Sequence, residues 1–156
     1  MPAKRQAFSH EDLNDLREAQ RNLVRELGFL DGYVAELQAT NVQCHALIEI
    51  EMRDGITSGE LGEILLVEKS TASRLVNGLK SKSWIQLKID KNDSRRKLIS
   101  LTAEGKNQVA RAHERANKEA TAAMKLLDQE QQQAVITGIS LYEEALRKYR
   151  LNRTSS

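Results

Sequence analysis

The side chains best suited to chemistry in this chain are cations and small hydrogen-bonding groups, and they gather in its middle. Residues 66–97 hold nine lysine and arginine residues against three acidic residues, which gives a local charge of +6 in a chain of net charge +2. A basic field concentrated on a nearly neutral chain is typical of a surface that binds a polyanion. The alternative is that these cations only keep the surface soluble, and charge alone favours neither.

A β-hairpin is predicted at the C-terminal end of this basic segment. Apolar and polar residues alternate over 85–89 and again over 99–101, which is the period of half-buried strands. The polar stretch 90–96 between them is suited to a hairpin loop. Thr102 then has the type and position of a helix cap, and a long helix is predicted from Ala103 to about residue 127.

The tip of this hairpin carries the run Asp93-Ser94-Arg95-Arg96-Lys97. A narrow DNA minor groove concentrates negative potential and attracts an inserted arginine. Arg95 or Arg96 is suited to that position, and Lys97 to a phosphate contact. Asp93 is expected to orient one of the arginines, because unpaired cations would repel one another and splay the tip. The simpler alternative is a solvated turn.

A helix is predicted over 68–81, directly before the hairpin. Its apolar residues recur at i, i+3, i+4 and i+7 and form one face. The other side carries hydroxyl, amide and cationic side chains, which are the types that read base edges in the DNA major groove. These candidate DNA-contacting residues are Lys69, Ser70, Thr71, Ser73, Arg74 and Asn77. Two simpler roles stay open: Arg74 as a structural partner of Asp93, and Asn77 as a solvated helix residue.

The pair Thr57 and Glu60 forms a capping box, which predicts a short helix that runs to residue 65. Together with helix 68–81 and the hairpin, this helix makes a winged helix-turn-helix, in which the second helix enters the major groove. A further helix is predicted before it, over 40–52. Its expected buried residues are Val42, Ala46, Leu47 and Ile50.

Long helices are predicted at both ends of the chain, over 9–30, 103–127 and 129–150. The last one carries apolar residues spaced four and three apart, a seam for another helix: Val135, Ile139, Tyr142, Leu146 and Tyr149. Because one small lobe cannot bury these stripes, a homodimer is expected. The predicted fold is mainly α with a small β-hairpin wing, in one domain over 1–156. Its DNA-binding lobe covers about 40–101, and its helical dimerisation region about 9–38 and 103–150.

Composition and motifs favour a cytoplasmic protein that is not an enzyme. A single cysteine, Cys44, fits a reducing compartment, and no apolar run approaches the roughly 20 residues of a membrane span. The N-terminus lacks the hydrophobic stretch of a secretory signal. No nucleophile–base pair, phosphate-binding glycine loop or metal-ligand spacing is found, so no cofactor and no metal are expected. Cys44 is expected to be a buried structural thiol rather than a redox sensor.

Two stretches, LGEILLVEKSTASRLVNGLKSKSWI (61–85) and DSRRKLISLTAEG (93–105), resemble the MarR family of bacterial transcription regulators. The resemblance covers about residues 42–105. The second stretch fits the wing signature of the family through Asp93, Arg95, Ile99, Leu101, Thr102 and Gly105. The resemblance implies that Arg95 contacts the minor groove, and Arg74 stands where the family often has an arginine.

The resemblance further implies a homodimer whose first and last two helices interlock, on a palindromic site in double-stranded DNA. A small-molecule effector of unknown identity is implied too, which makes the chain a ligand-responsive repressor. Two alternatives are kept. One is the winged-helix N-terminal part of a longer acetyltransferase fusion protein. The other is a helical protein-interaction module with an incidental basic stripe, which would bind DNA without a steep dependence on salt.

Overall fold

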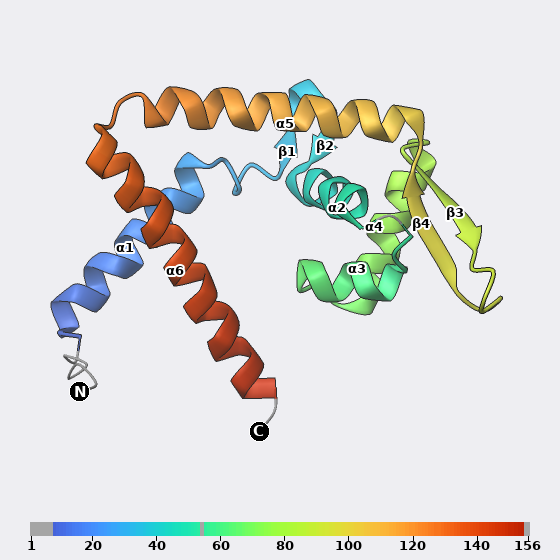
Figure 1. Ribbon diagram of the computed structural model, residues 1–156, viewed down its shortest axis with the longest axis horizontal. Helices are drawn as coiled ribbons and strands as arrows, with labels where there is room; N and C mark the ends of the chain where they lie inside the picture. Colours follow the sequence, from blue (N-terminus) through green and yellow to red (C-terminus); the bar gives the residue numbers. More distant parts are fainter. Residues whose placement is uncertain (1–7, 54, 155–156) are drawn as a thin grey trace. The chain divides into compact units, whose positions relative to one another are not determined.

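The computed structural model describes residues 8–53 and 55–154 (Figure 1). Contacts divide the chain into two compact units, one up to Ala112 and one from His113. The first unit begins with α1 (His10–Glu26), β1 (Tyr33–Val34), a 3-10 helix (Ala35–Leu37) and β2 (Ala39–Thr40). It continues with α2 (Asn41–Met52), α3 (Ser58–Leu65), α4 (Lys69–Ser81), β3 (Ile85–Ile89) and β4 (Lys97–Leu101). The last helices are α5 (Ala103–Met124), which crosses the boundary between the units, and α6 (Gln129–Thr154). The predicted class, mainly α with a small hairpin wing, is confirmed.

The start of α1 is fixed by a capping box, in which the Asp12 amide donates to Ser9 Oγ at 3.0 Å and the Ser9 amide donates back to the Asp12 carboxylate. The helix ends at Glu26, short of the predicted residue 30. Gly28 has a φ of +71°, a left-handed conformation that breaks a helix and that glycine adopts without strain. Leu16, Leu23 and Leu30 are spaced seven residues apart, so this apolar pattern continues past the point where the backbone leaves the helix.

A second, very short hairpin joins β1 to β2, and it was not predicted from the sequence. Tyr33 pairs with Thr40 and Val34 pairs with Ala39, around a 3-10 turn that ends at Gln38 in a left-handed conformation. Two-residue strands are too short to show an alternating pattern, so the segment is recognisable only from its packing. It buries Val34, Leu37 and Ala39 in the core of the first unit.

The core of the first unit lies between α2, α3, α4 and the wing. As predicted, α2 buries Ala46, Leu47 and Ile50. The prediction for Val42 is wrong, since its side chain is 40% exposed. Val42 lies in the first turn of α2, where it lines an open cavity with Phe29 and His45 instead of packing on the core. Cys44 is half-buried and packs against the core, so its thiol is less enclosed than predicted.

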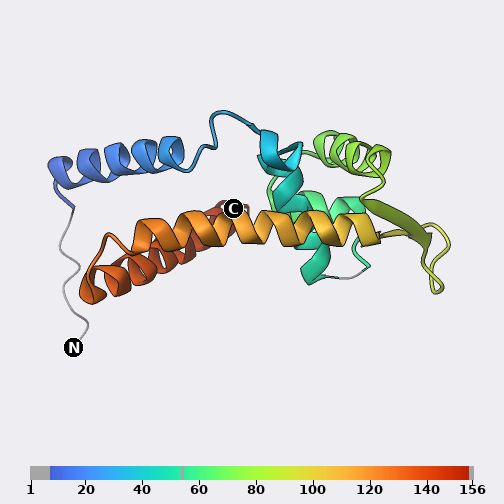
Figure 2. The ribbon, with the colours of Figure 1, turned by 90° about the horizontal axis from the view of Figure 1, so that it is seen from above.

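The wing is the antiparallel pair β3–β4, with Ile85 opposite Leu101 and Ile89 opposite Lys97. Figures 1 and 2 both show this hairpin extending beyond the helices of its unit. Ile99 also pairs with Ile56, the residue before the α3 cap: its amide donates to the Ile56 carbonyl at 2.7 Å. Trp84, buried at the base of β3, packs where helix and wing meet. The base of the wing is therefore held by the pairing of Ile99 with Ile56 on β4 and by the buried Trp84 at the start of β3.

The wing joins α5 through the motif Leu101-Thr102-Ala103-Glu104-Gly105. As predicted, Thr102 caps α5, because its Oγ accepts from the Gly105 amide at 3.0 Å. The same hydroxyl donates to the Ser83 carbonyl at 2.7 Å. A Cβ on Gly105 would lie 1.9 Å from the Trp84 carbonyl oxygen, so only glycine lets the helix pass here.

In the second unit, α6 begins at a cap in which the Gln131 amide donates to Asp128 Oδ1 at 2.8 Å. Gln132 then donates to the carbonyl of Met124, the last residue of α5, and to the carbonyl of Leu127 in the turn between the two helices. None of the described residues of α6 is buried, and Ile139, Leu146 and Tyr149 are 56%, 49% and 62% exposed. No helix in the described ranges has the length and apolar character that crossing a membrane requires.

Candidate nucleic-acid interface

The helix-turn-helix consists of α3 and α4, which cross closely at two small residues. A Cβ on Gly62 would lie 3.0 Å from the Ala72 Cβ, so there is no room for a larger residue at either position without movement. The turn between the helices places Leu66 in a left-handed conformation with φ of 55°, and the Val67 amide donates to the Gly62 carbonyl. This close crossing fixes the direction of α4 relative to α3.

One face of α4 is buried and the other is open to solvent. Ala72, Leu75, Val76 and Leu79 are the buried residues. Among the predicted base-reading residues, Thr71 is half-buried and five are exposed: Lys69, Ser70, Ser73, Arg74 and Asn77. The apolar face therefore holds the helix in place while hydroxyl, amide and cationic groups point outward, which is the arrangement that reading base edges requires.

Among the residues that the structure describes, the Arg74 side chain is hydrogen-bonded within its own helix and not to the wing. Its Nη2 donates to Thr71 Oγ1 at 3.3 Å. The alternative role of Arg74 as a partner of Asp93 does not match the structure, because Asp93 is paired with Arg95. Arg74 thus stays on the exposed face of α4, next to the other candidate residues.

The wing tip is organised by Asp93, as predicted. Its Oδ1 accepts from the Arg95 amide at 3.0 Å and from Arg95 Nε at 3.1 Å, and its Oδ2 from Arg95 Nη2 at 3.4 Å. These hydrogen bonds from Arg95, with the nearby charge of Arg96, hold the pKa of Asp93 below its usual value of 3.8. The Arg95 side chain is still 89% exposed. Asp93 therefore restrains the direction of Arg95 without covering it.

Arg96, the second candidate for the tip, has a different position. Its Nη2 donates to Glu60 Oε1 at 2.9 Å, and its Nε lies 3.9 Å from the Asp90 carboxylate. Glu60 belongs to the first turn of α3, so this ion pair ties the wing loop to the helix-turn-helix. No sequence pattern indicates the pair, because the partners are 36 residues apart and the capping box already accounts for Glu60.

Glu60 makes its contacts with both carboxylate oxygens. Oε2 accepts from the Thr57 amide at 2.7 Å and from the Thr57 hydroxyl at 2.9 Å, while Oε1 accepts from Arg96. The hydrogen bonds from Thr57, followed by the charge and hydrogen bond of Arg96, hold the pKa of Glu60 below its usual value of 4.5. The predicted capping box of Thr57 and Glu60 is confirmed, and Arg96 also binds its glutamate.

These two carboxylates give a test that separates the arginines. We expect Arg95→Ala to raise the pKa of Asp93 and leave that of Glu60 nearly unchanged, and Arg96→Ala to raise that of Glu60. Carboxyl chemical shifts measured against pH by NMR report each group. Folding lowers both pKa values. The contacts of Glu60 therefore stabilise the fold fully at a pH above its usual pKa of 4.5, and those of Asp93 at a pH above its usual pKa of 3.8. Their contribution is lost as the pH falls through the lowered values. An Arg96→Ala variant with an unchanged Glu60 titration would contradict the ion pair in solution.

The first unit also contains a cavity of about 530 Å³ beside the helix-turn-helix. Its wall includes Val42 and Ile64, and the rings of Phe29 and His45 lie 5.8 Å apart beside them. The lining is mainly apolar with a few polar side chains, which is typical of small-molecule sites.

Comparison with known proteins agrees with this geometry. A model of the MarR family matches residues 37–96. The multiple antibiotic resistance protein MarR of Salmonella typhimurium, like that of Salmonella typhi, is 30% identical over 90 residues. That match covers 58% of this chain and 62% of each relative, so it spans less than two thirds of their length.

Solved structures extend the likeness to most of the chain. MepR, a transcription regulator of the Staphylococcus aureus multidrug efflux pump MepA, covers 89% of this chain and 99% of its own, at 22% identity and a TM-score of 0.61. PcaV from Streptomyces coelicolor, in complex with its natural ligand, covers 90% and 99%, at 21% identity and a TM-score of 0.68. The transcriptional repressor CouR, bound to a 23-mer DNA duplex, covers 88% and 99%, at 19% identity and a TM-score of 0.69. At these identities the likeness shows a shared fold.

Proposed function

We propose that the chain is a sequence-specific, DNA-binding transcriptional regulator of the MarR family, on the premise that a model of this family matches its residues 37–96. The observation that carries the proposal is the pairing of an exposed polar face on α4 with an exposed arginine, Arg95, at the tip of a fixed wing. A helix face of this composition suits the major groove, and a restrained arginine suits the minor groove.

The proposal assigns different roles to the candidate residues. Lys69, Ser70, Thr71, Ser73, Arg74 and Asn77 form the reading face, and Lys97 contacts phosphate. Arg95 is the minor-groove residue, because it is the more exposed of the two tip arginines. Arg96 positions the wing through Glu60, which differs from the expectation that either arginine could enter the groove.

We propose that the protein acts as a homodimer on a palindromic operator. Support comes from apolar side chains that its own chain leaves open: α1 has no buried residue, and Leu13, Leu23 and Leu146 are between 44% and 49% exposed. Several large apolar side chains exposed along one helix, as on α1 and again on α6, are typical of a protein interface. In this proposal α1, α5 and α6 form the dimerisation region, and two copies of the wing and α4 reach two half-sites.

The same proposal includes a small-molecule effector, repression as the default effect and a cytoplasmic location. The cavity beside Phe29 and His45 is the candidate effector site, because it borders α3 of the helix-turn-helix. The proposed role is binding and not catalysis. This part of the proposal rests on the exposed polar face of α4 and on the exposed Arg95. Among the described residues, no group of His, Cys, Asp and Glu side chains has the composition of a metal site.

The proposal is tested by binding measurements on duplex DNA selected from a random library, with a scrambled duplex for comparison, at two salt concentrations. Arg95→Ala should weaken binding to both duplexes by similar factors and lower the salt slope by about one unit. Arg74→Ala or Ser73→Ala should cost about 1–3 kcal/mol on the selected duplex and much less on the scrambled one. The difference follows because a minor-groove arginine carries little base information.

Lys118→Ala is the matched control, since it removes the same charge from an exposed position on α5. It should leave affinity and discrimination nearly unchanged. If the library yields no preferred sequence and Arg95→Ala binds as the wild type does, the wing is a solvated turn and the chain is an interaction module.

A further inference from the structure

The C-terminal end of α4 carries a lysine with an unusual set of contacts, the C-cap residue Lys82. Its side chain is half-buried, and its ammonium donates to the Gln38 carbonyl and, at 3.4 Å, to Gln43 Oε1. The same ammonium lies 4.4 Å from the centre of the Trp84 ring, which is a cation–π contact. One charged group thus joins the end of α4 to the 3-10 turn, the start of α2 and the base of the wing.

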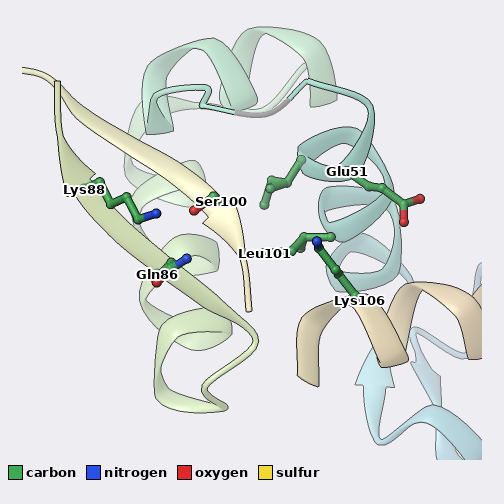
Figure 3. Close-up of a pocket in the computed structure, with 7 residues that line it drawn as sticks. Glu51, Gln86, Lys88, Ser100, Leu101 and Lys106 are labelled. Carbon is green, nitrogen blue, oxygen red and sulfur yellow. The ribbon is translucent and has the colours of Figure 1, made fainter. Parts of the chain in front are cut away.

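Other lysines of the first unit are placed differently. Figure 3 shows Lys88 on β3 and Lys106 on α5, which line a cavity of about 490 Å³ between the wing, α2 and α5. Both residues are exposed, as lysines usually are. Lys82 is instead held by partners from three elements, and fixing so long a side chain costs conformational entropy. These contacts therefore point to a positional role rather than to a general surface charge.

The 3-10 turn that takes this ammonium is also held by two side chains of α5. Gln108 Nε2 donates to the Leu37 carbonyl at 3.1 Å, and Arg111 Nη2 donates to the Glu36 carbonyl. The carbonyl of Gln38 is the third in the row. Carbonyls at the C-terminal end of a helical turn lack partners within the turn and carry partial negative charge, which cations favour. The end of α4 and α5 are thereby both fastened to the same turn.

Gln43 gives the contact a second function. Its Oε1 accepts from the Thr40 amide at 3.0 Å in the capping box of α2, and it accepts from Lys82 as well. A Cβ on Gly78 would lie 3.4 Å from Gln43 Nε2, so the amide group of Gln43 packs directly on α4. The end of α4 and the start of α2 thus share one side chain.

The chain leaves α4 in a conformation that needs support. Ser83 has a φ of 59°, a left-handed conformation that is costly for residues other than glycine. The Ser83 amide donates to the Lys80 carbonyl at 2.9 Å, and the Trp84 amide donates to the Leu79 carbonyl at 3.1 Å, which is the Schellman pattern of a helix end. Such conformations persist where surrounding contacts determine them. The ammonium of Lys82 supplies one of these contacts through the Trp84 ring.

We propose that Lys82 is a positioning residue for DNA reading, which fixes the C-terminal end of α4 to the 3-10 turn and to the start of α2 and so gives the reading face one orientation. This role rests on the proposed function and adds a residue that acts without touching a base. The close crossing with α3 at Gly62 and Ala72 already fixes the other part of α4. Orientation matters because base-edge hydrogen bonds depend on distance and angle, whereas attraction to phosphate depends mainly on charge.

The first test uses the full chain without DNA, so it does not depend on the proposed function. Lys82→Met keeps a long side chain but removes the charged donor, and Lys82→Arg restores a charged donor. Amide hydrogen exchange followed by NMR measures local opening. With Lys82→Met we expect exchange about tenfold faster at the Gln38 and Trp84 amides, as for a lost hydrogen bond to a charged group. The Leu61 amide at the start of α3 should not change, and Lys82→Arg should exchange as the wild type does.

The second test measures affinity for the selected and the scrambled duplex. Lys80→Met is the matched control, because it removes the same charge from the last turn of the same helix. It should weaken binding to both duplexes by the same small factor. Lys82→Met should weaken binding to the selected duplex about tenfold more than to the scrambled one, which is the effect of about one misplaced base contact. Lys82→Arg should restore most of this discrimination, which a role limited to overall charge does not explain.

Two results would overturn the proposal. One is exchange at Gln38 and Trp84 that Lys82→Met leaves unchanged, and the other is an equal loss of affinity on the two duplexes. If the wild type selects no sequence from the library, the proposed function fails, and the exchange rates alone decide whether Lys82 holds the end of α4. The dispersion of each NMR spectrum checks folding first, and Lys82→Gln replaces Lys82→Met in both tests if the methionine variant does not fold.

Discussion

Gly105→Ala is expected to destabilise the protein by about 3 kcal/mol, at the upper end of the cost of overpacking, or to prevent folding. The added Cβ would lie 1.9 Å from the Trp84 carbonyl oxygen and 2.9 Å from its carbonyl carbon. Both atoms belong to the backbone, so no side-chain rotation can relieve the clash. Either α5 or the base of the wing has to move, and the Thr102 cap and the hydrogen bond from the Thr102 amide to the Trp84 carbonyl depend on both. Denaturant unfolding followed by circular dichroism measures the effect.

Gly59→Ala is the matched control for this substitution. A Cβ on Gly59 would meet only Thr57 Oγ1, at 3.9 Å, which is an ordinary contact. Because alanine favours a helix more than glycine does, this variant should be as stable as the wild type or up to about 1 kcal/mol more stable. Equal stabilities of the two alanine variants would show that the approach of α5 to Trp84 is looser than the structure indicates.

Ile139→Glu together with Leu146→Glu is expected to abolish the proposed dimer. The two residues lie seven apart on α6 and are 56% and 49% exposed in the single chain, so an interface is the place that could bury them. Carboxylates there would be desolvated without partners, which costs far more than an interface gains from two side chains. Sedimentation should therefore change from a dimer of roughly 35 kDa, twice the 17.6 kDa of one chain, to a monomer or an unfolded chain.

Thr137→Glu controls for the added charge. Thr137 stands on the opposite side of α6 from Ile139, outside the seam with spacings of four and three residues. This variant should remain a dimer. A wild-type chain that sediments as a stable monomer at micromolar concentration would refute the proposed assembly, and with it the reading of two half-sites by one protein.

Helix starts were predictable from the sequence because each depends on residues three apart. Ser9 with Asp12, and Thr57 with Glu60, form capping boxes in the structure as the pattern indicates. The change from a period of 3.6 to a period of 2 after residue 81 likewise located the wing strands. These signals involve only residues that are close in sequence, so they can be recognised without knowing which elements pack together.

Features that depend on contacts distant in sequence were not predictable. Val42 fits the apolar pattern of α2, but the fold opens a cavity at that position. The Arg96–Glu60 ion pair and the reason for glycine at 105 both require knowing which elements lie side by side. For the candidate site, residue types predicted the exposed face of α4, whereas the distinction between the two tip arginines came only from their partners.

Glu60 also limits which sequences can carry this fold. Many capping boxes accept glutamine in place of glutamate, since one amide oxygen can take the hydrogen bond that the cap requires. Here each of the two carboxylate oxygens serves a different element, one the start of α3 and the other the wing. An amide offers a single acceptor, so it would have to release one of them. The start of α3 and the wing loop, 36 residues away, therefore both depend on Glu60. The effects of substitutions at Thr57 and Arg96 on stability should not be additive.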